Sequence, residues 1–287
     1  MLPARPPFES RPQPDGDAAI RQTDSDAANA RFSAVQKGYL TDPFIKPLLP
    51  RGAHLQPARP PLINVGTPYA AQLSSYVEID FPENTTKKAM AIRKSKELSS
   101  HLGKPEDVKL AEGGTALYAS IYHLLPIDMR RPPIETLTPT LGPILSSSLP
   151  TLLIFECVLC YMSPEASAAI VQWFVDHLSA APEKPVLGGI VYEMFGLGDA
   201  FGQVMYENLK VRNVTLPGVE PYQDVPSLPK RFLQHGFTIS ELEMLDELEE
   251  LDLVLQHYAI TWGVKVFNTS TSVPWSQWGI QPADPSE

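Results

Sequence analysis

The chain has 287 residues, a formal net charge of −10 at pH 7, 43% hydrophobic residues and 20% charged residues. This acidity argues against a general binder of nucleic acid or anionic membranes, whose surface would be basic, and two cysteines are too few for a disulfide scaffold. No apolar run reaches the ~18 residues that span a bilayer, and the first residues lack the apolar segment of a secretory leader. We therefore expect a cytoplasmic protein without membrane or nucleic-acid partners.

The N-terminal part is rich in proline, which is present 30 times in the chain. Residues 1–21 combine proline with charge and few apolar side chains, a composition typical of disorder. Residues 27–38 have helical spacing and reach Gly38, a common helix stop. Prolines recur too often between residues 43 and 61 for a helix or a central strand.

Beyond residue 70, predicted strands alternate with predicted helices. Alternating or continuous apolar runs predict strands at 76–81, 117–127, 151–162, 185–193 and 257–267. Helical spacing and capping residues predict helices at 85–100, 164–179, 199–211, 227–235 and 241–256, the last with a solvated acidic face. This order predicts an α/β doubly wound sheet within one domain, residues 22–267, followed by a tail, residues 268–287.

Carboxylates gather where the predicted strands end. Glu78 and Asp80 end the first strand, Asp128 follows the second, and Glu156 lies within the third. Ligands of such sheets bind beyond the carboxyl ends of the strands, and a carboxylate there can accept both hydroxyls of a ribose. Most loop carboxylates are simply solvated. Glu156 interrupts an apolar strand, so it either pairs with a buried cation or faces a ligand.

The two cysteines, Cys157 and Cys160, have C-x-x-C spacing but no second ligand pair. On a strand their thiols would point to opposite faces, so we expect two buried core thiols and no metal site. The sequence contains neither a G-x-S-x-G elbow nor a Walker loop.

Several long strings resemble the leucine carboxyl methyltransferase family, particularly its fungal members. They are TDSDAANARFSAVQKGYLTDPF at 23–44, YVEIDFPENTTKKAMAIRKSKELS at 76–99, TLLIFECVLCYMSPEASAAIVQWF at 151–174 and GDAFGQVMYENLKVR at 198–212. The resemblance implies a Rossmann-like methyltransferase sheet with helices on both faces. It also implies S-adenosylmethionine as cofactor and, as substrate, the α-carboxylate of the C-terminal leucine on the catalytic subunit of a type 2A protein phosphatase.

The resemblance also implies site residues. Asp80 takes the ribose-binding position, and Asp128 with Met129 occupies the family's Asp-Leu pair beside the adenine. Glu156 corresponds to the family's glutamate that faces the cofactor, which favours the ligand-facing alternative. Arg31 matches a basic residue of the N-terminal segment that helps to hold a carboxylate.

Tyr161 corresponds to a position beside the site that contacts the substrate leucine. No catalytic base is expected, because a C-terminal carboxylate has a pKa near ~3.5 and is ionised at neutral pH. Methyl transfer then needs alignment and exclusion of water, which proximity supplies.

One departure from the family pattern concerns the cofactor cradle. The family has an Asn-x-Gly-Thr string, then an arginine, a helix and a strand ending in Gly-Ala-Gly-x-Asp-Thr. Here LINVGT at 62–67 is followed by PYAAQLSS at 68–75, which leads directly into the strand at 76–81. Eight residues span at most about 28 Å, too little for that helix and strand. The first central strand and its glycine turn are therefore predicted to be missing.

This gap predicts weak or absent cofactor binding and a less stable domain. Three interpretations stay open for the chain: a methyltransferase, a non-catalytic phosphatase-binding protein, or a misspliced remnant. We expect a monomer in each case.

Overall fold

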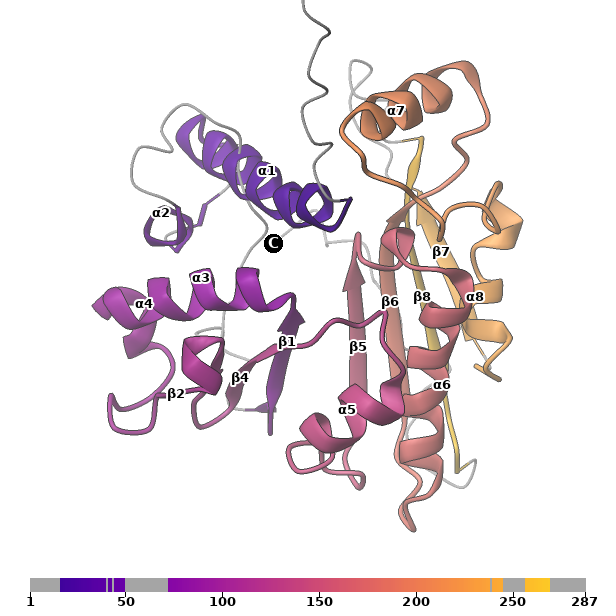
Figure 1. Ribbon diagram of the computed structural model, residues 1–287. Coiled ribbons are helices and arrows are strands. Elements are labelled where there is room, and N and C mark those ends of the chain that lie inside the picture. The colour runs from indigo at the N-terminus through magenta and orange to yellow at the C-terminus, as the bar shows by residue number, and fades with distance from the viewer. Residues whose placement is uncertain are drawn as a thin grey trace, which may run out of the picture.

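The structure is a computed structural model, and it describes residues 16–39, 41–42, 44–49, 72–237, 239–244 and 256–268. Within this part of the chain no helix is long and apolar enough to cross a membrane. The strands belong to two four-stranded sheets, and helices pack against both of them (Figure 1). The α/β class is therefore confirmed.

The first sheet has the strand order β1-β4-β3-β2. Its strands are β1 (Tyr76–Asp80), β2 (Lys109–Ala111), β3 (Ala116–Tyr118) and β4 (Tyr122–Pro126). β1 is parallel to β4, whereas β3 is antiparallel to both β2 and β4. The stretch 117–127, predicted as one strand, is instead a hairpin of β3 and β4, because Ser120 interrupts the apolar run and the chain turns back there.

The second sheet has the strand order β5-β6-β8-β7. Its strands are β5 (Thr151–Glu156), β6 (Leu187–Met194), β7 (Ile239–Met244) and β8 (Tyr258–Lys265). β5 and β6 are parallel, and β8 is antiparallel to both β6 and β7. The acidic helix predicted at 241–256 is wrong over its described start, because β7 pairs its backbone along β8 and tertiary pairing overrides the helical leucine spacing.

The two sheets stand in one row with β1 and β5 as the facing edge strands (Figure 1). Within the described residues, no strand joins them. This break lies beside β1, the first strand after the point where the sequence predicts a missing central strand.

The helices are α1 (Gly16–Gln36), α2 (Ile45–Leu48), α3 (Pro82–Lys94), α4 (Lys96–Ser100), α5 (Pro133–Leu141), α6 (Pro164–Ser179), α7 (Ala200–Val211) and α8 (Lys230–Leu233). α6 starts as predicted, since Ser163 caps it by accepting a hydrogen bond from the Ala166 N–H at 3.2 Å. α5 was not predicted. The helix predicted at 85–100 is divided at Ser95, whose hydroxyl caps α4.

Two predictions for the N-terminal part need correction. Residues 16–21, expected to be disordered, form the first turns of α1, where Asp17 and Arg21 pair with charges on other elements. The proline-rich stretch contains the short helix α2, which tolerates Pro47 because it has only four residues. Residues 1–15, most of 50–71, and the tail beyond Asn268 lie outside the described residues, so the predicted disorder, gap and tail stay predictions there.

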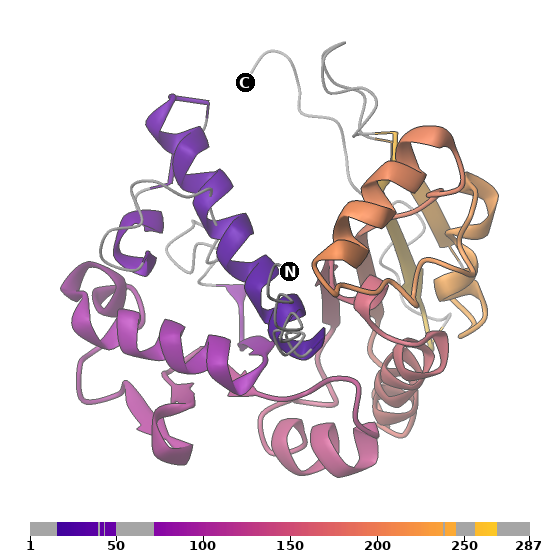
Figure 2. The ribbon, with the colours of Figure 1, turned by 45° about the horizontal axis from the view of Figure 1, so that its top comes forward.

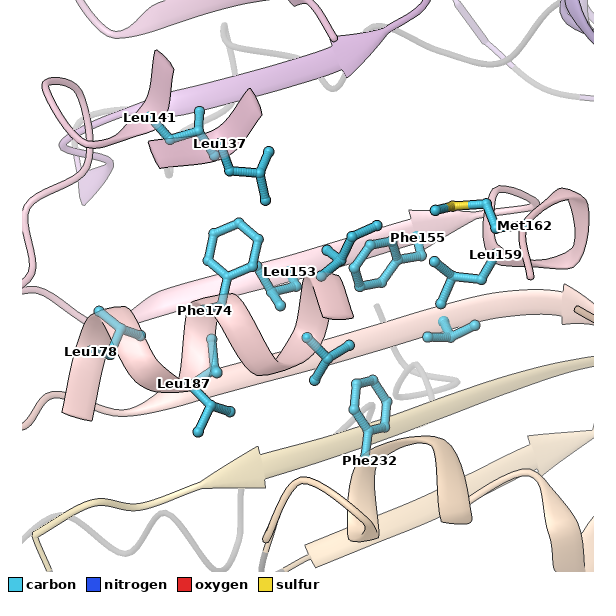
Figure 3. Close-up of a cluster of buried hydrophobic side chains, with 14 of the residues drawn as sticks. Leu137, Leu141, Leu153, Phe155, Leu159, Met162, Phe174, Leu178, Leu187 and Phe232 are labelled. Atoms are coloured by element: carbon cyan, nitrogen blue, oxygen red, sulfur yellow. The ribbon is translucent and has the colours of Figure 1, made fainter. Parts of the chain in front are cut away.

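One apolar cluster joins the two sheets. Leu125 lies on β4 of the first sheet and Ile127 follows that strand, whereas Leu153 and Phe155 lie on β5 of the second sheet. Side chains of α5 and α6, among them Leu137, Leu141, Phe174 and Leu178, pack between them (Figure 3). The break in backbone pairing is therefore not a break in the core.

Candidate functional site

Three carboxylates lie at the carboxyl ends of neighbouring strands. Asp80 ends β1, Asp128 follows β4, and Glu156 ends β5. β1 and β5 point the same way, and α1 lies across the edge where they end (Figures 1 and 2). Since ligands of α/β sheets bind beyond the carboxyl ends of the strands, this edge is the candidate site.

Asp80 is held in place by its own neighbours. Its Oδ1 accepts a hydrogen bond from the Phe81 N–H at 2.6 Å, and both oxygens lie 3.2 Å from Asn84 Nδ2. Burial nevertheless raises the pKa of Asp80 to about 6, and the bond from Phe81 only partly opposes this. A carboxylate that is costly to ionise at the end of a strand is typical of a functional position.

Asp128 connects the site to α1 through Arg130. Its Oδ1 accepts from Arg130 Nε at 2.9 Å and its Oδ2 accepts from Nη2 at 2.8 Å, while Arg130 also pairs with Asp17 of α1. The hydrogen bonds from Arg130 lower the pKa of Asp128. The Arg130 guanidinium lies 5.0 Å from the centre of the Phe81 ring. Met129, which lies between Asp128 and Arg130 in the sequence, packs against the apolar cluster that joins the two sheets.

Glu156 is an exposed side chain at the end of β5, and no cation is paired with it among the described residues. Burial raises its pKa, and the positive charges of Arg31 and Lys88 oppose that rise. Within the described part of the chain it makes no ion pair. Lys88 instead pairs with Glu78, which also accepts a hydrogen bond from the Tyr122 hydroxyl at 2.8 Å. The buried-cation alternative is therefore not what the structure has.

Arg31 and Tyr161 reach the same edge from different elements. Arg31 of α1 donates from Nε to Asp42 Oδ2 at 2.6 Å, so its charge is partly used within the N-terminal part. Tyr161 hydrogen-bonds with Thr23 of α1, and burial raises the pKa of its hydroxyl. The structure thus places Asp80, Asp128 and Glu156 at neighbouring strand ends, whereas Met129 packs against the core and Arg31 pairs with Asp42.

The sequence analysis missed a buried pair behind the site. Glu193 of β6 and Arg231 of α8 are 2% and 4% exposed, with 4.0 Å between Glu193 Oε2 and Arg231 Nη1. Glu193 Oε1 accepts from the backbone N–H groups of Val158 and Leu159, at 3.1 and 2.5 Å. Glu193 therefore holds the turn that follows Glu156. Glu193 is the last residue of the strand predicted at 185–193, so the search for acids at strand ends could have identified it. No pattern in the sequence indicates that Arg231 is buried.

The cysteines lie in this turn rather than on a strand. Cys157 has a left-handed backbone (φ 48°), and Cys160 is fully buried. Both thiols are free, and burial raises the pKa of each. The described residues contain no group of three metal-binding side chains. The prediction of two buried core thiols is confirmed for Cys160, whereas Cys157 is only partly buried and neither cysteine lies on a strand.

Comparison with known proteins identifies the family. A family model described as leucine carboxyl methyltransferase matches residues 68–175. A protein of Cryptococcus neoformans named leucine carboxyl methyltransferase 1 is 35% identical, over 92% of this chain and 98% of its own length. The chain belongs to the leucine carboxyl methyltransferase family. The bovine protein of the same name is 31% identical, over 91% of this chain and 95% of its own length.

These alignments also bear on the missing segment. The Cryptococcus alignment runs over 355 positions, but 92% of this 287-residue chain is only about 264 residues, so about 91 positions of the relative have no counterpart here. The same arithmetic for the bovine protein, 332 positions against about 261 residues, leaves about 71. Relatives therefore contain polypeptide that this member of the family lacks.

Solved structures give a weaker likeness. A structure described as PigF with SAH has a TM-score of 0.38 and 11% identity, over 70% of this chain and 47% of that chain. The complex of LepI with SAM has a TM-score of 0.37 and 12% identity, over 88% of this chain and 62% of that chain. The family assignment rests on the sequence relatives.

Methyltransferases of this family use S-adenosylmethionine, and the residues present fit one half of it. Asp80 and Glu156 offer carboxylate oxygens to ribose hydroxyls, and the Oδ1 of Asn84 beside Asp80 is buried without a partner among the described residues. The other half, with methionine, needs backbone N–H groups of a glycine turn on a central strand, and the described residues contain none between β1 and β5. The described residues therefore fit the nucleoside half of the cofactor, but they include no glycine turn that could hold its methionine half.

Proposed function

We propose that this family member transfers a methyl group from S-adenosylmethionine to the C-terminal leucine carboxylate of a type 2A protein phosphatase catalytic subunit. The observation that carries the proposal is the row of carboxylates at the ends of β1, β4 and β5, in a chain of this family. We further propose a cytoplasmic monomer that regulates the phosphatase through this modification.

The roles of the residues follow from their chemistry. The cofactor supplies a methyl group on a sulfonium, which a carboxylate attacks directly. Asp80 and Glu156 would accept hydrogen bonds from the ribose hydroxyls. Asp128, held by Arg130, would lie beside the adenine together with Met129. Arg31 would hold a carboxylate, and Tyr161 would contact the leucine side chain. α1 would exclude water, because it lies across the edge where these groups meet (Figure 2).

The break between β1 and β5 favours a second candidate function for this chain. A member without the glycine turn could keep its phosphatase-facing segments and bind the subunit without methylating it. Titration calorimetry of S-adenosylmethionine into the 287-residue chain separates the two candidates.

Micromolar binding, together with transfer of labelled methyl to the phosphatase subunit, supports the enzyme. A folded chain that binds the subunit in a pull-down but neither binds nor uses the cofactor supports the second candidate. A chain that binds neither leaves only the remnant interpretation and refutes both functions. The Cryptococcus relative serves as the positive control in each assay.

A further inference from the structure

The turn 157–161 connects two residues of the candidate site. Glu156 is the last residue of β5, and Tyr161 ends the turn with its hydroxyl hydrogen-bonded to Thr23 of α1. Cys157, directly after Glu156, has a left-handed backbone (φ 48°), which L side chains rarely adopt. Such a conformation persists only where the surrounding structure fixes it. The directions of both site residues therefore depend on what holds this turn.

The side chain of Glu193 on β6 holds the turn through two backbone groups. Its Oε1 accepts from the N–H of Val158 at 3.1 Å and from that of Leu159 at 2.5 Å. Glu193 is 2% exposed, so water does not replace these bonds when they are lost. Because a buried N–H without an acceptor costs free energy, the position of this one oxygen fixes both peptide units.

A second set of contacts holds the same turn. The Gly218 N–H donates to the Cys160 carbonyl at 3.0 Å, and the Gly218 carbonyl accepts from Arg231 Nη2 at 3.4 Å. A side chain does not fit at Gly218, since its Cβ would lie 2.0 Å from the Leu159 carbonyl oxygen. Leu159 and Met162 pack into the apolar cluster that joins the two sheets (Figure 3). The turn is thus held through both its N–H groups and its carbonyl groups.

Stability alone does not explain why a charged pair lies behind the turn. Glu193 Oε2 and Arg231 Nη1 are 4.0 Å apart, and neither atom makes a hydrogen bond among the described residues. Replacing a buried ion pair by well-packed apolar side chains of similar volume is often neutral or stabilising. A polar pair at this place is therefore expected to specify a conformation rather than to add stability.

We propose that Glu193 is a positioning residue of the site: by accepting from two N–H groups of the turn 157–161, its Oε1 sets the directions of Glu156 and Tyr161. Glu193 acts through the turn, without contact to a ligand, and Arg231 supplies the counter-charge that a buried carboxylate needs. The proposal rests on the proposed function only for the roles of Glu156 and Tyr161 toward the ribose and the leucine.

Two double variants separate the hydrogen bonds from the charge. Glu193→Gln with Arg231→Met keeps an oxygen for the two N–H groups, whereas Glu193→Met with Arg231→Met removes it. Both variants lack the same two charges. Leu98→Ala is the matched control, because Leu98 is 3% exposed in an apolar cluster that contains no residue of the turn, so its loss lowers stability elsewhere. Circular dichroism and urea denaturation check that each variant folds.

Two readouts follow the turn in the full chain. One is the nuclear Overhauser effect (NOE) between the Tyr161 ring and the Thr23 methyl group in selectively labelled protein, which needs no ligand. The other is calorimetric titration of adenosine, whose ribose Glu156 would hold. The native protein, Leu98→Ala and the glutamine double variant should keep the NOE and bind adenosine within about threefold of one another. The methionine double variant should lose the NOE and bind at least about tenfold more weakly, because small displacements of binding groups are costly.

Several outcomes overturn the proposal. One is a folded methionine double variant that keeps the NOE and the affinity, since the turn would then need no acceptor. Another is loss of both in the glutamine double variant, which would make the charge the cause, or in Leu98→Ala, which would make stability the cause. If the methionine double variant does not fold, Glu193→Asp takes its place: it keeps the charge but is one carbon shorter, and retention of the NOE overturns the proposal. A native protein that binds no adenosine refutes the proposed function, and the NOE then decides the role of Glu193.

Discussion

Replacing Asp80 with asparagine should stabilise the fold at neutral pH and have little effect in acid. Burial raises the pKa of Asp80 from 3.8 to about 6, so the native state keeps its proton at pH values where the unfolded chain has lost it. Between about pH 4 and pH 6, unfolding therefore releases a proton, and the free energy of unfolding falls as the pH rises.

The size of the effect follows from the same numbers. At 1.36 kcal/mol per pH unit, a rise from 3.8 to about 6 makes the ionised side chain cost about 3 kcal/mol above pH 6. Asparagine carries no charge, and its Oδ1 can still accept from the Phe81 N–H. Its amide would face Asn84, whose own buried Oδ1 lacks a partner among the described residues and can accept after the Asn84 amide turns.

The assay is urea denaturation of the native protein and the Asp80→Asn variant at pH 4 and at pH 7.5. We expect the variant to gain about 2–3 kcal/mol relative to the native protein between the two pH values. Groups other than Asp80 titrate in both proteins and cancel in the difference. A variant that is equally or less stable at both pH values would refute the reasoning, since Asp80 would then carry no cost of ionisation.

Three further predictions concern the buried pair, the turn and cofactor binding. Glu193→Gln should destabilise the fold by about 3–5 kcal/mol in urea denaturation, because Arg231 is left buried without its counter-charge. Adding Arg231→Met should restore part of the loss, and an unchanged urea midpoint of Glu193→Gln would contradict the prediction. Gly218→Ala should cost about 1–3 kcal/mol, because the new Cβ meets the Leu159 carbonyl oxygen, whereas Gly16→Ala, with its nearest contact at 3.5 Å, should cost nothing. Calorimetry should find cofactor binding at least tenfold weaker than in the Cryptococcus relative, and equal affinity would show that another segment replaces the glycine turn.

The fold was predictable where local signals and tertiary context agree. β1, α6, α7 and β8 have clear periodicity and caps, and the structure has them within about two residues of the predicted ends. The predictions fail where the structure of a segment depends on the strand with which it pairs. The leucine spacing after Ile239 is helical, yet pairing with β8 makes this segment a strand.

The candidate site was predictable from strand ends and from the resemblance, but its supports were not. The sequence marks Asp80 as an acid at a strand end and Glu156 as an acid within an apolar strand. It gives no sign that Arg130 joins Asp128 to Asp17, because Asp17 lies 113 residues before Arg130 in the chain. Nor does it show that Arg231 is buried beside Glu193. Long-range charge pairs depend on packing, which a single sequence does not reveal.

The helix α1 is attached to the rest of the molecule in two different ways along its length. Toward its C-terminal end, Ala28 and Phe32 are buried against Ile45 in a small apolar cluster. Its N-terminal half makes three ion pairs, namely Asp17 with Arg130, Arg21 with Glu83 and Asp26 with Arg212, and adds only Ala19 to an apolar cluster. These partly exposed pairs weaken with ionic strength, since the screening length falls from about 10 Å at 0.1 M salt to about 3 Å at 1 M. Concentrated salt should therefore loosen the N-terminal half of α1, which covers the acids, while its apolar anchor and both sheets stay folded.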